Sequence, residues 1–236
     1  MCGRFTSFSD PDQLAQFFQV DEVATSALPE RYNVAPTQEV YAVIERDAKR
    51  ALGTLRWGLV PFWAPDPKGA PAPINARIES LLDKQFFRDP FERRRCLLPA
   101  DGFYEWRQTG QLTEKGKPKK QPYYIHRVDG KPLAFAGIWS SWRARDDPDA
   151  PPLYTCAIVT RDAVGPVMKR LHDRMPVALP EEAWERWLDV EDTDAQALVG
   201  YVIDLAPPEL DAYPVTTRVN NVRNEGPELL ARDESA

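Results

Sequence analysis

The sequence has 236 residues, a formal net charge of −6, 43% hydrophobic residues and 28% charged residues. These values are ordinary for a soluble globular protein, and a chain of this length can bury a core without disulfides or metal ions. It contains no run of about 18 apolar residues, so we expect no membrane span. The opening MCGRFTSFSD lacks the apolar core of a signal peptide, so we expect a cytoplasmic protein.

Three cysteines and two histidines bear on redox chemistry and metal binding. An odd number of cysteines with no C-x-x-C pair is typical of a reducing compartment. Cys96 and Cys156 lie in apolar, strand-like runs, which favours their burial as small hydrophobic residues. Because thiols and imidazoles are sparse and scattered, we expect no zinc site and no cofactor.

The charge is unevenly distributed. The segment 179–212 carries −9, which leaves +3 for the rest of the chain. Basic clusters lie at 93–95, at 115–120, and at Lys169, Arg170 and Arg174. A local basic groove can therefore be hidden by the acidic total. For 115–120, within TGQLTEKGKPKKQP, the composition favours a solvated, flexible hairpin loop.

The order of predicted elements indicates an α+β domain over 1–226 and a tail over 227–236. A capped apolar stripe predicts a helix over 10–20, RYNVAPTQ (31–38) is predicted as a loop, and 39–45 and 51–57 as a hairpin. A proline-rich segment precedes a short helix at 78–84. Further strands are expected within 94–108, 122–128, 133–139, 153–159, 175–179 and 213–217, and helices at 163–171, 181–188 and 194–203. Because strands and helices do not alternate, we expect a curled, mostly antiparallel sheet or partial barrel with peripheral helices, in a monomer.

Cys2 becomes the N-terminal residue once Met1 is removed, which places an amine and a thiol on adjacent carbons. Their reference pKa values, about 7.7–8.0 and about 8.5, leave both groups partly nucleophilic near neutrality. An aldehyde can form a Schiff base with the amine, and the thiol can then close a five-membered thiazolidine. By itself Cys2 at this position is weak evidence. Gly3 leaves room beside it, and Arg4 supplies a guanidinium suited to a phosphate.

Eight segments carry a resemblance to a known family. They are MCGRF (1–5), RYNVAP (31–36), RWGLVPFW (56–63), NAR-E (75–79), CLLPADGFYEW (96–106), the strand 157–160, HDRMPV (172–177) and VNNVRNEG (219–226). In this order they resemble the SRAP family, the SOS-response-associated peptidase domains also described as abasic-site processing proteins. The resemblance implies a single SRAP domain that binds single-stranded DNA in the DNA damage response, near the nucleoid. It also implies covalent crosslinking of abasic sites through Cys2, with strand incision by lyase chemistry.

Within this resemblance, Cys2 matches the family nucleophile and Asn75 its active-site asparagine, whose amide can donate to a developing oxyanion. Glu105 can accept a proton from the Cys2 amine or hold its ammonium; a structural ion pair with Arg77 or Arg4 is the alternative. His172 can move protons during sugar ring opening and imine formation, or form a structural pair with Asp173.

Eight residues are candidates for DNA contacts. Arg4, Arg77 and Arg161 suit phosphates, and Trp57, Phe62 and Trp63 suit stacking on bases. Trp57 ends an apolar strand, so core packing is its equal alternative. Asn33 and Pro36 match the family's DNA-facing loop, although Asn33 also suits a turn that binds backbone.

Three other functions remain open from the sequence. An N-terminal thiol with His and Glu nearby can attack an amide, as in a peptidase that removes Met1. Glutamine amidotransferases also begin with Cys-Gly, but their further motifs and a synthetase domain are not found here. A single-strand binder with an inert Cys2 is the non-enzymatic alternative.

Overall fold

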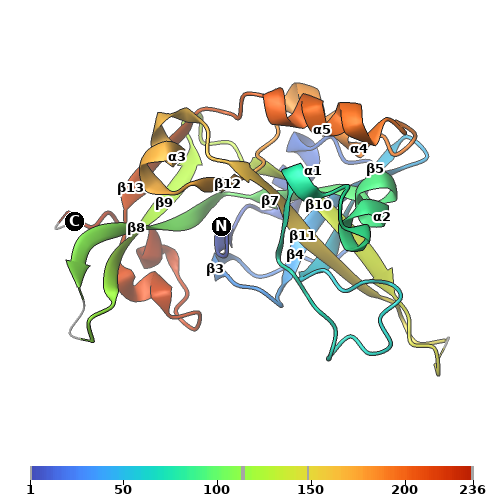
Figure 1. Ribbon diagram of the computed structural model, residues 1–236, viewed down its shortest axis with the longest axis horizontal. Helices are drawn as coiled ribbons and strands as arrows, with labels where there is room; N and C mark the ends of the chain where they lie inside the picture. The colour runs from blue at the N-terminus through green and yellow to red at the C-terminus, as the bar shows by residue number, and fades with distance from the viewer. Residues whose placement is uncertain (1, 113–114, 148, 235–236) are drawn as a thin grey trace.

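Two β-sheets organise the chain in a computed structural model, which describes residues 2–112, 115–147 and 149–234 (Figure 1). The first sheet has the strand order β13-β9-β8-β1-β3, and every pairing in it is antiparallel. Its strands are β1 (Phe5–Ser7), β3 (Arg31–Val34), β8 (Gly102–Leu112), β9 (Pro118–Arg127) and β13 (Leu210–Pro214).

The second sheet has the order β12-β11-β10-β7-β4-β5-β2, and β6 pairs with β11. Because β11 also pairs in parallel with β5, the strands β11, β10, β7, β4 and β5 close into a ring. The predicted α+β class with a curled, mostly antiparallel sheet is thus confirmed. The bounds are β2 (Glu22–Val23), β4 (Glu39–Arg46), β5 (Lys49–Trp57), β6 (Asn75–Arg77), β7 (Arg95–Ala100), β10 (Leu133–Trp142), β11 (Leu153–Asp162) and β12 (Arg174–Pro176).

Three of the ring strands, β7, β10 and β11, bury both of their faces over most of their length. Alternate residues point to opposite faces of a strand, so Leu97 joins one apolar cluster while its neighbours Cys96 and Leu98 join another. This double burial explains the unbroken apolar runs of β7, β10 and β11 in the sequence. The second cluster includes Cys2 and Trp57, and it lies between the two sheets and α3.

The helices are α1 (Pro11–Phe17), α2 (Gln85–Arg93), α3 (Gly165–Leu171), α4 (Trp184–Leu188) and α5 (Ala195–Asp204). The helices α1, α2, α4 and α5 pack on the apolar cluster that contains Leu97. Their buried contacts include Leu14, Phe91, Trp187 and Leu198. The fifth, α3, lies above the base of the β8–β9 hairpin (Figure 1). None of the helices in the described part of the chain has the length and apolar character required to span a bilayer.

Two local predictions are wrong. RYNVAPTQ is not a loop throughout: Arg31–Val34 forms β3, because the backbone of β1 needs a second partner strand beside β8. The helix predicted over 78–84 is one 3-10 turn, η1 (Ile78–Ser80), and the helix follows as α2. Burial of Phe87, Pro90 and Phe91, spaced three and four residues apart, fixes α2 against the sheet although Pro90 lies inside it.

Both the hairpin tip and the predicted tail differ in detail from expectation. Within 115–120, Pro118 to Lys120 belong to β9, whereas residues 113–114 lie outside the described residues. After residue 226 the chain forms a 3-10 turn, η4 (Pro227–Leu230), with Leu229 buried. Arg232 then pairs with Val215, so the described part of the predicted tail packs on the domain.

Candidate active site

Cys2 lies three residues before β1, in the apolar cluster between the two sheets. Its side chain is 0% exposed, and its Sγ lies 3.9 Å from the carbonyl oxygen of Arg4. Burial, together with the charge of Glu105, raises the pKa of the Cys2 thiol well above its ordinary value. The thiol is therefore protonated at neutral pH, and its proton must be transferred when the sulfur reacts.

Asn75 fixes the backbone of Cys2. It lies in β6, which pairs with β11 through Ile158, and its Nδ2 donates a 2.8 Å hydrogen bond to the carbonyl oxygen of Cys2. Its Oδ1 is buried and accepts no hydrogen bond within the described part of the chain. A buried acceptor without a partner is costly, so this oxygen is a ready acceptor for a hydroxyl or amine of a bound molecule.

Glu105 is the buried acid of the site, with 3% of its surface exposed. It lies in β8 directly opposite Tyr123 of β9. Burial raises the pKa of Glu105 above its ordinary value, and the positive charge of His172 opposes this effect. A carboxyl with a raised pKa can both accept and return a proton near neutrality.

His172 ends α3 and points its ring toward Glu105. Its Nε2 lies 3.9 Å from Oε2 of Glu105, and its Nδ1 lies 2.6 Å from Oδ1 of Asp173. The backbone N–H of Arg174 also donates to Nδ1 at 2.9 Å. Asp173 can accept a hydrogen bond from Nδ1 only when this nitrogen carries a proton, whereas the Arg174 N–H can donate to it only when it does not. Nδ1 therefore has a hydrogen-bond partner whether or not it carries a proton.

Arg174 ties the histidine segment to the asparagine segment, and the list of site residues drawn from the sequence does not include it. Its two terminal nitrogens bind the two carboxylate oxygens of Glu79 at 2.8 and 2.9 Å, and Nη1 also binds Asp162 at 2.6 Å. Glu79 follows the NAR strand directly, so this bidentate pair sets the spacing between Asn75 and His172. The signal for it was present in the motifs NAR-E and HDRMPV.

Arg4 and Asn33 together hold the late VNNVRNEG segment. Asn33 is 0% exposed, and its Nδ2 donates to the carbonyl oxygens of Val219, Asn221 and Asn224. Nη1 of Arg4 donates to Oδ1 of Asn33 at 2.7 Å. Of the two alternatives for Asn33, the structure therefore agrees with a residue that binds backbone, because its polar atoms are used inside the protein.

Two further predicted DNA contacts are structural. Trp57 is 0% exposed and its Nε1 donates to the carbonyl oxygen of Ile74, so core packing is the correct alternative. Arg161 is buried, and its guanidinium binds the carbonyl oxygens of Val202, Ile203 and Leu205 at the end of α5. Neither side chain is free to contact DNA, because each is covered by a segment distant in the sequence, whose position the sequence does not reveal.

The remaining candidates lie at the surface. Phe62 and Trp63 are 52% and 50% exposed in the proline-rich loop, and Arg77 is exposed at the end of β6. Pro36 is partly buried. Across the described ranges, no cluster of three or more His, Cys, Asp or Glu side chains is arranged to hold a metal ion.

This fold and site define a class of protein in which a ring-forming α+β framework encloses a cysteine that follows Met1, with Asn, Glu and His around it. The chain belongs to the SRAP family: the family model described as "SOS response associated peptidase (SRAP)" matches residues 1–222. The abasic site processing protein YoqW of Bacillus subtilis is 39% identical, with 98% of this chain and 99% of that protein covered. The abasic site processing protein YedK of Escherichia coli is 33% identical over the same shares.

Solved structures show the same fold. A protein from Bacteroides thetaiotaomicron superposes with a TM-score of 0.80 at 24% identity, covering 98% of this chain and all of the other. A phage-related protein from Bordetella bronchiseptica gives a TM-score of 0.69 at 31% identity, over 92% of this chain and 95% of its own.

Proposed function

We propose that this protein processes abasic sites by capturing the sugar aldehyde covalently on Cys2 in single-stranded DNA. The observation that carries the proposal is the convergence of Asn75, Glu105 and His172 on Cys2 from β6, β8 and the end of α3. The names of the relatives YoqW and YedK support the choice of substrate. The half-exposed Phe62 and Trp63 are suited to stacking on the bases of a single strand.

The chemistry begins once Met1 is removed. The α-amine of Cys2 adds to the aldehyde carbon, and loss of water leaves an imine. The Sγ atom then adds to the imine carbon, and the thiol proton passes to the nitrogen to give a thiazolidine. The net reaction joins aldehyde and cysteine with release of one water. The same imine can undergo β-elimination, which cuts the strand.

Each neighbouring side chain has a role in these steps. Glu105 takes a proton from the Cys2 ammonium and returns one when water leaves, a role suited to its raised pKa. His172 moves protons as the closed sugar opens to the aldehyde. Asn75 holds the Cys2 carbonyl and offers its Oδ1 to a sugar hydroxyl.

The test is the intact mass of the protein, alone and after incubation with an abasic single-stranded oligonucleotide. We expect Met1 to be absent and the adduct mass to equal both reactants less one water. Cys2→Ser is the matched control, since it keeps the amine and can form only an imine that reduction traps. A denaturation-resistant adduct formed by Cys2→Ala without reduction would overturn the mechanism.

We also infer a second activity, removal of Met1 by the protein itself, from the word peptidase in the family description and from the acid and imidazole beside Cys2. Glu105→Ala and His172→Ala are purified and weighed. Retained Met1 in both supports self-processing. Complete removal in both assigns the step to a cellular aminopeptidase.

A further inference from the structure

The face of the β8–β9 hairpin that carries Glu105 continues outward beyond the active site. On β8 the alternate positions Glu105, Arg107 and Thr109 share this face. On β9, Tyr123 lies opposite Glu105, and Gln121 lies opposite Arg107. Two residues of a strand span about 7 Å, so a chain leaving Cys2 along β8 meets Arg107 first.

A groove of about 500 Å³ lies beside this outer face. Its lining is polar and comes from both strands of the hairpin and from the C-terminal segment: Arg107, Gln108, Thr109, Gln111, Lys119, Gln121, Tyr123, Thr217 and Asp233. The Gln121 amide donates to the carbonyl oxygen of Val215 at 2.8 Å, which fixes the inner wall. Arg107 and Lys119 are exposed, and neither forms an ion pair with another described residue.

We propose that this groove is a subsite for the sugar–phosphate backbone on one side of the captured nucleotide, with Arg107 and Lys119 as its phosphate contacts. The proposal rests on the proposed function, because that function brings a polyanion to Cys2. Tyr123 lies at the end of the groove nearest the active site, opposite Glu105. Lys119 thus has a binding role that the composition of 115–120 does not indicate.

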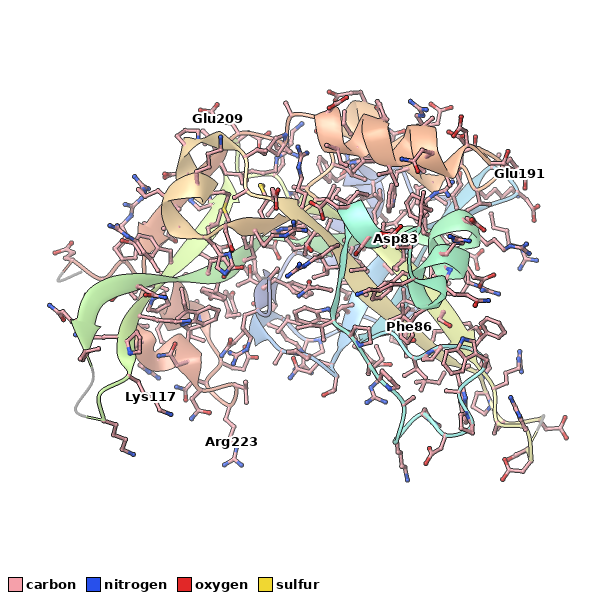
Figure 2. All side chains as sticks on the ribbon, in the orientation of Figure 1. Asp83, Phe86, Lys117, Glu191, Glu209 and Arg223 are labelled. Carbon is pink, nitrogen blue, oxygen red and sulfur yellow. The ribbon has the colours of Figure 1, made fainter. Side chains whose placement is uncertain are left out.

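The distribution of charge supports a polyanion here. Most acidic residues of 179–204 lie on and between α4 and α5, and Glu191 lies at the opposite edge of the molecule from Lys117, which marks the outer hairpin, whereas Glu209 lies beside α3 (Figure 2). The groove carries two cations against the single carboxylate of Asp233. A polar groove with excess positive charge suits phosphodiesters better than an apolar peptide.

The first experiment measures binding of an undamaged single-stranded oligonucleotide as a function of salt. Arg107→Ala/Lys119→Ala is compared with Lys115→Ala/Lys117→Ala, a control that removes equal charge from exposed positions on the same hairpin but outside the groove. Loss of two single-strand phosphate contacts makes the slope of log affinity against log salt concentration shallower by about 1.4. When salt is raised from 50 to 200 mM, the factor by which affinity falls should therefore be about sevenfold smaller for the groove variant than for wild type. Equal slopes for the two variants would overturn the proposal.

The second experiment uses the one-sided position of the hairpin. Capture is timed with an abasic residue at the 5′ end or at the 3′ end of otherwise equal oligonucleotides. At subsaturating concentration the groove variant is expected to capture one of the two oligonucleotides more slowly than wild type does, and to match wild type with the other. Equal slowing of capture with both oligonucleotides would show a general charge effect and would refute the proposed subsite. If wild type captures neither, the proposed function itself is wrong.

Discussion

The imidazole Nε2 of His172, at the end of α3, lies 3.9 Å from Oε2 of Glu105 in β8, and Glu105 in turn acts electrostatically on the Cys2 thiol. At this distance the pair can exchange a proton through a small movement of the ring. Because Glu105 is 3% exposed, its charge is costly unless a cation lies beside it. The positive charge of His172 therefore opposes the rise that burial causes in the pKa of Glu105.

Glu105→Gln is expected to change the pH dependence of stability. Burial raises the pKa of Glu105, so the folded state binds a proton that the unfolded state releases. The carboxyl's contribution to the free energy of unfolding is therefore greatest below about pH 4.3, which is its pKa in the unfolded chain. This contribution is lost as the pH rises through the raised pKa of the folded state. Thermal melting should show Glu105→Gln gaining on wild type between pH 4 and pH 7. A constant difference would contradict the buried-acid assignment.

Asn75→Asp is expected to slow capture while leaving the fold intact. The change keeps the shape of the side chain but replaces the 2.8 Å N–H donor to the Cys2 carbonyl with an acceptor. A lost hydrogen bond costs about 0.5–1.5 kcal/mol, so capture should fall about tenfold or more, since two oxygens now face each other. Single-turnover capture measures this. Asn75→Ala serves as the control, because it removes the donor without adding repulsion and should be less impaired.

Arg174→Met is expected to loosen the segment that carries His172. The bidentate pair with Glu79 and the contact with Asp162 are lost, which should cost about 1–3 kcal/mol by denaturant unfolding. Glu79→Gln completes a double-mutant cycle, with a coupling energy of about 0.5–3 kcal/mol expected for contacting residues. Additive effects within error would show that the pair does not connect the two segments.

Trp57→Ala and Trp63→Ala are expected to separate stability from DNA binding. Trp57 is fully buried, so its truncation should cost about 3–5 kcal/mol, with affinity per folded molecule unchanged. Trp63 is 50% exposed, so its truncation should alter stability by only about 0.5 kcal/mol. If Trp63 stacks on a base, affinity for single-stranded DNA should fall roughly 5- to 150-fold. The reverse assignment of effects would contradict the packing described here.

Cys2, Asn75, Glu105 and His172 were predicted from motifs, and the structure brings the four together. The sequence could supply them because each lies in a short segment that resembles a motif of the SRAP family. The failures share a different property. Trp57 and Arg161 were candidates for DNA contacts from their residue type and Asn33 from its place in a family motif, and neither kind of evidence reveals what covers a side chain.

By itself, the sequence determined the α+β class and most strands, because the alternation of apolar residues encodes these directly, and it supplied the candidate site residues through motifs that resemble the SRAP family. Only the tertiary structure decided that β11 pairs with β5 to close the ring and that the VNNVRNEG segment folds onto Asn33. It also decided that Arg174 binds Glu79. These contacts join segments far apart in the chain, and their energies depend on burial and on shared hydrogen-bond partners, which a local pattern does not contain.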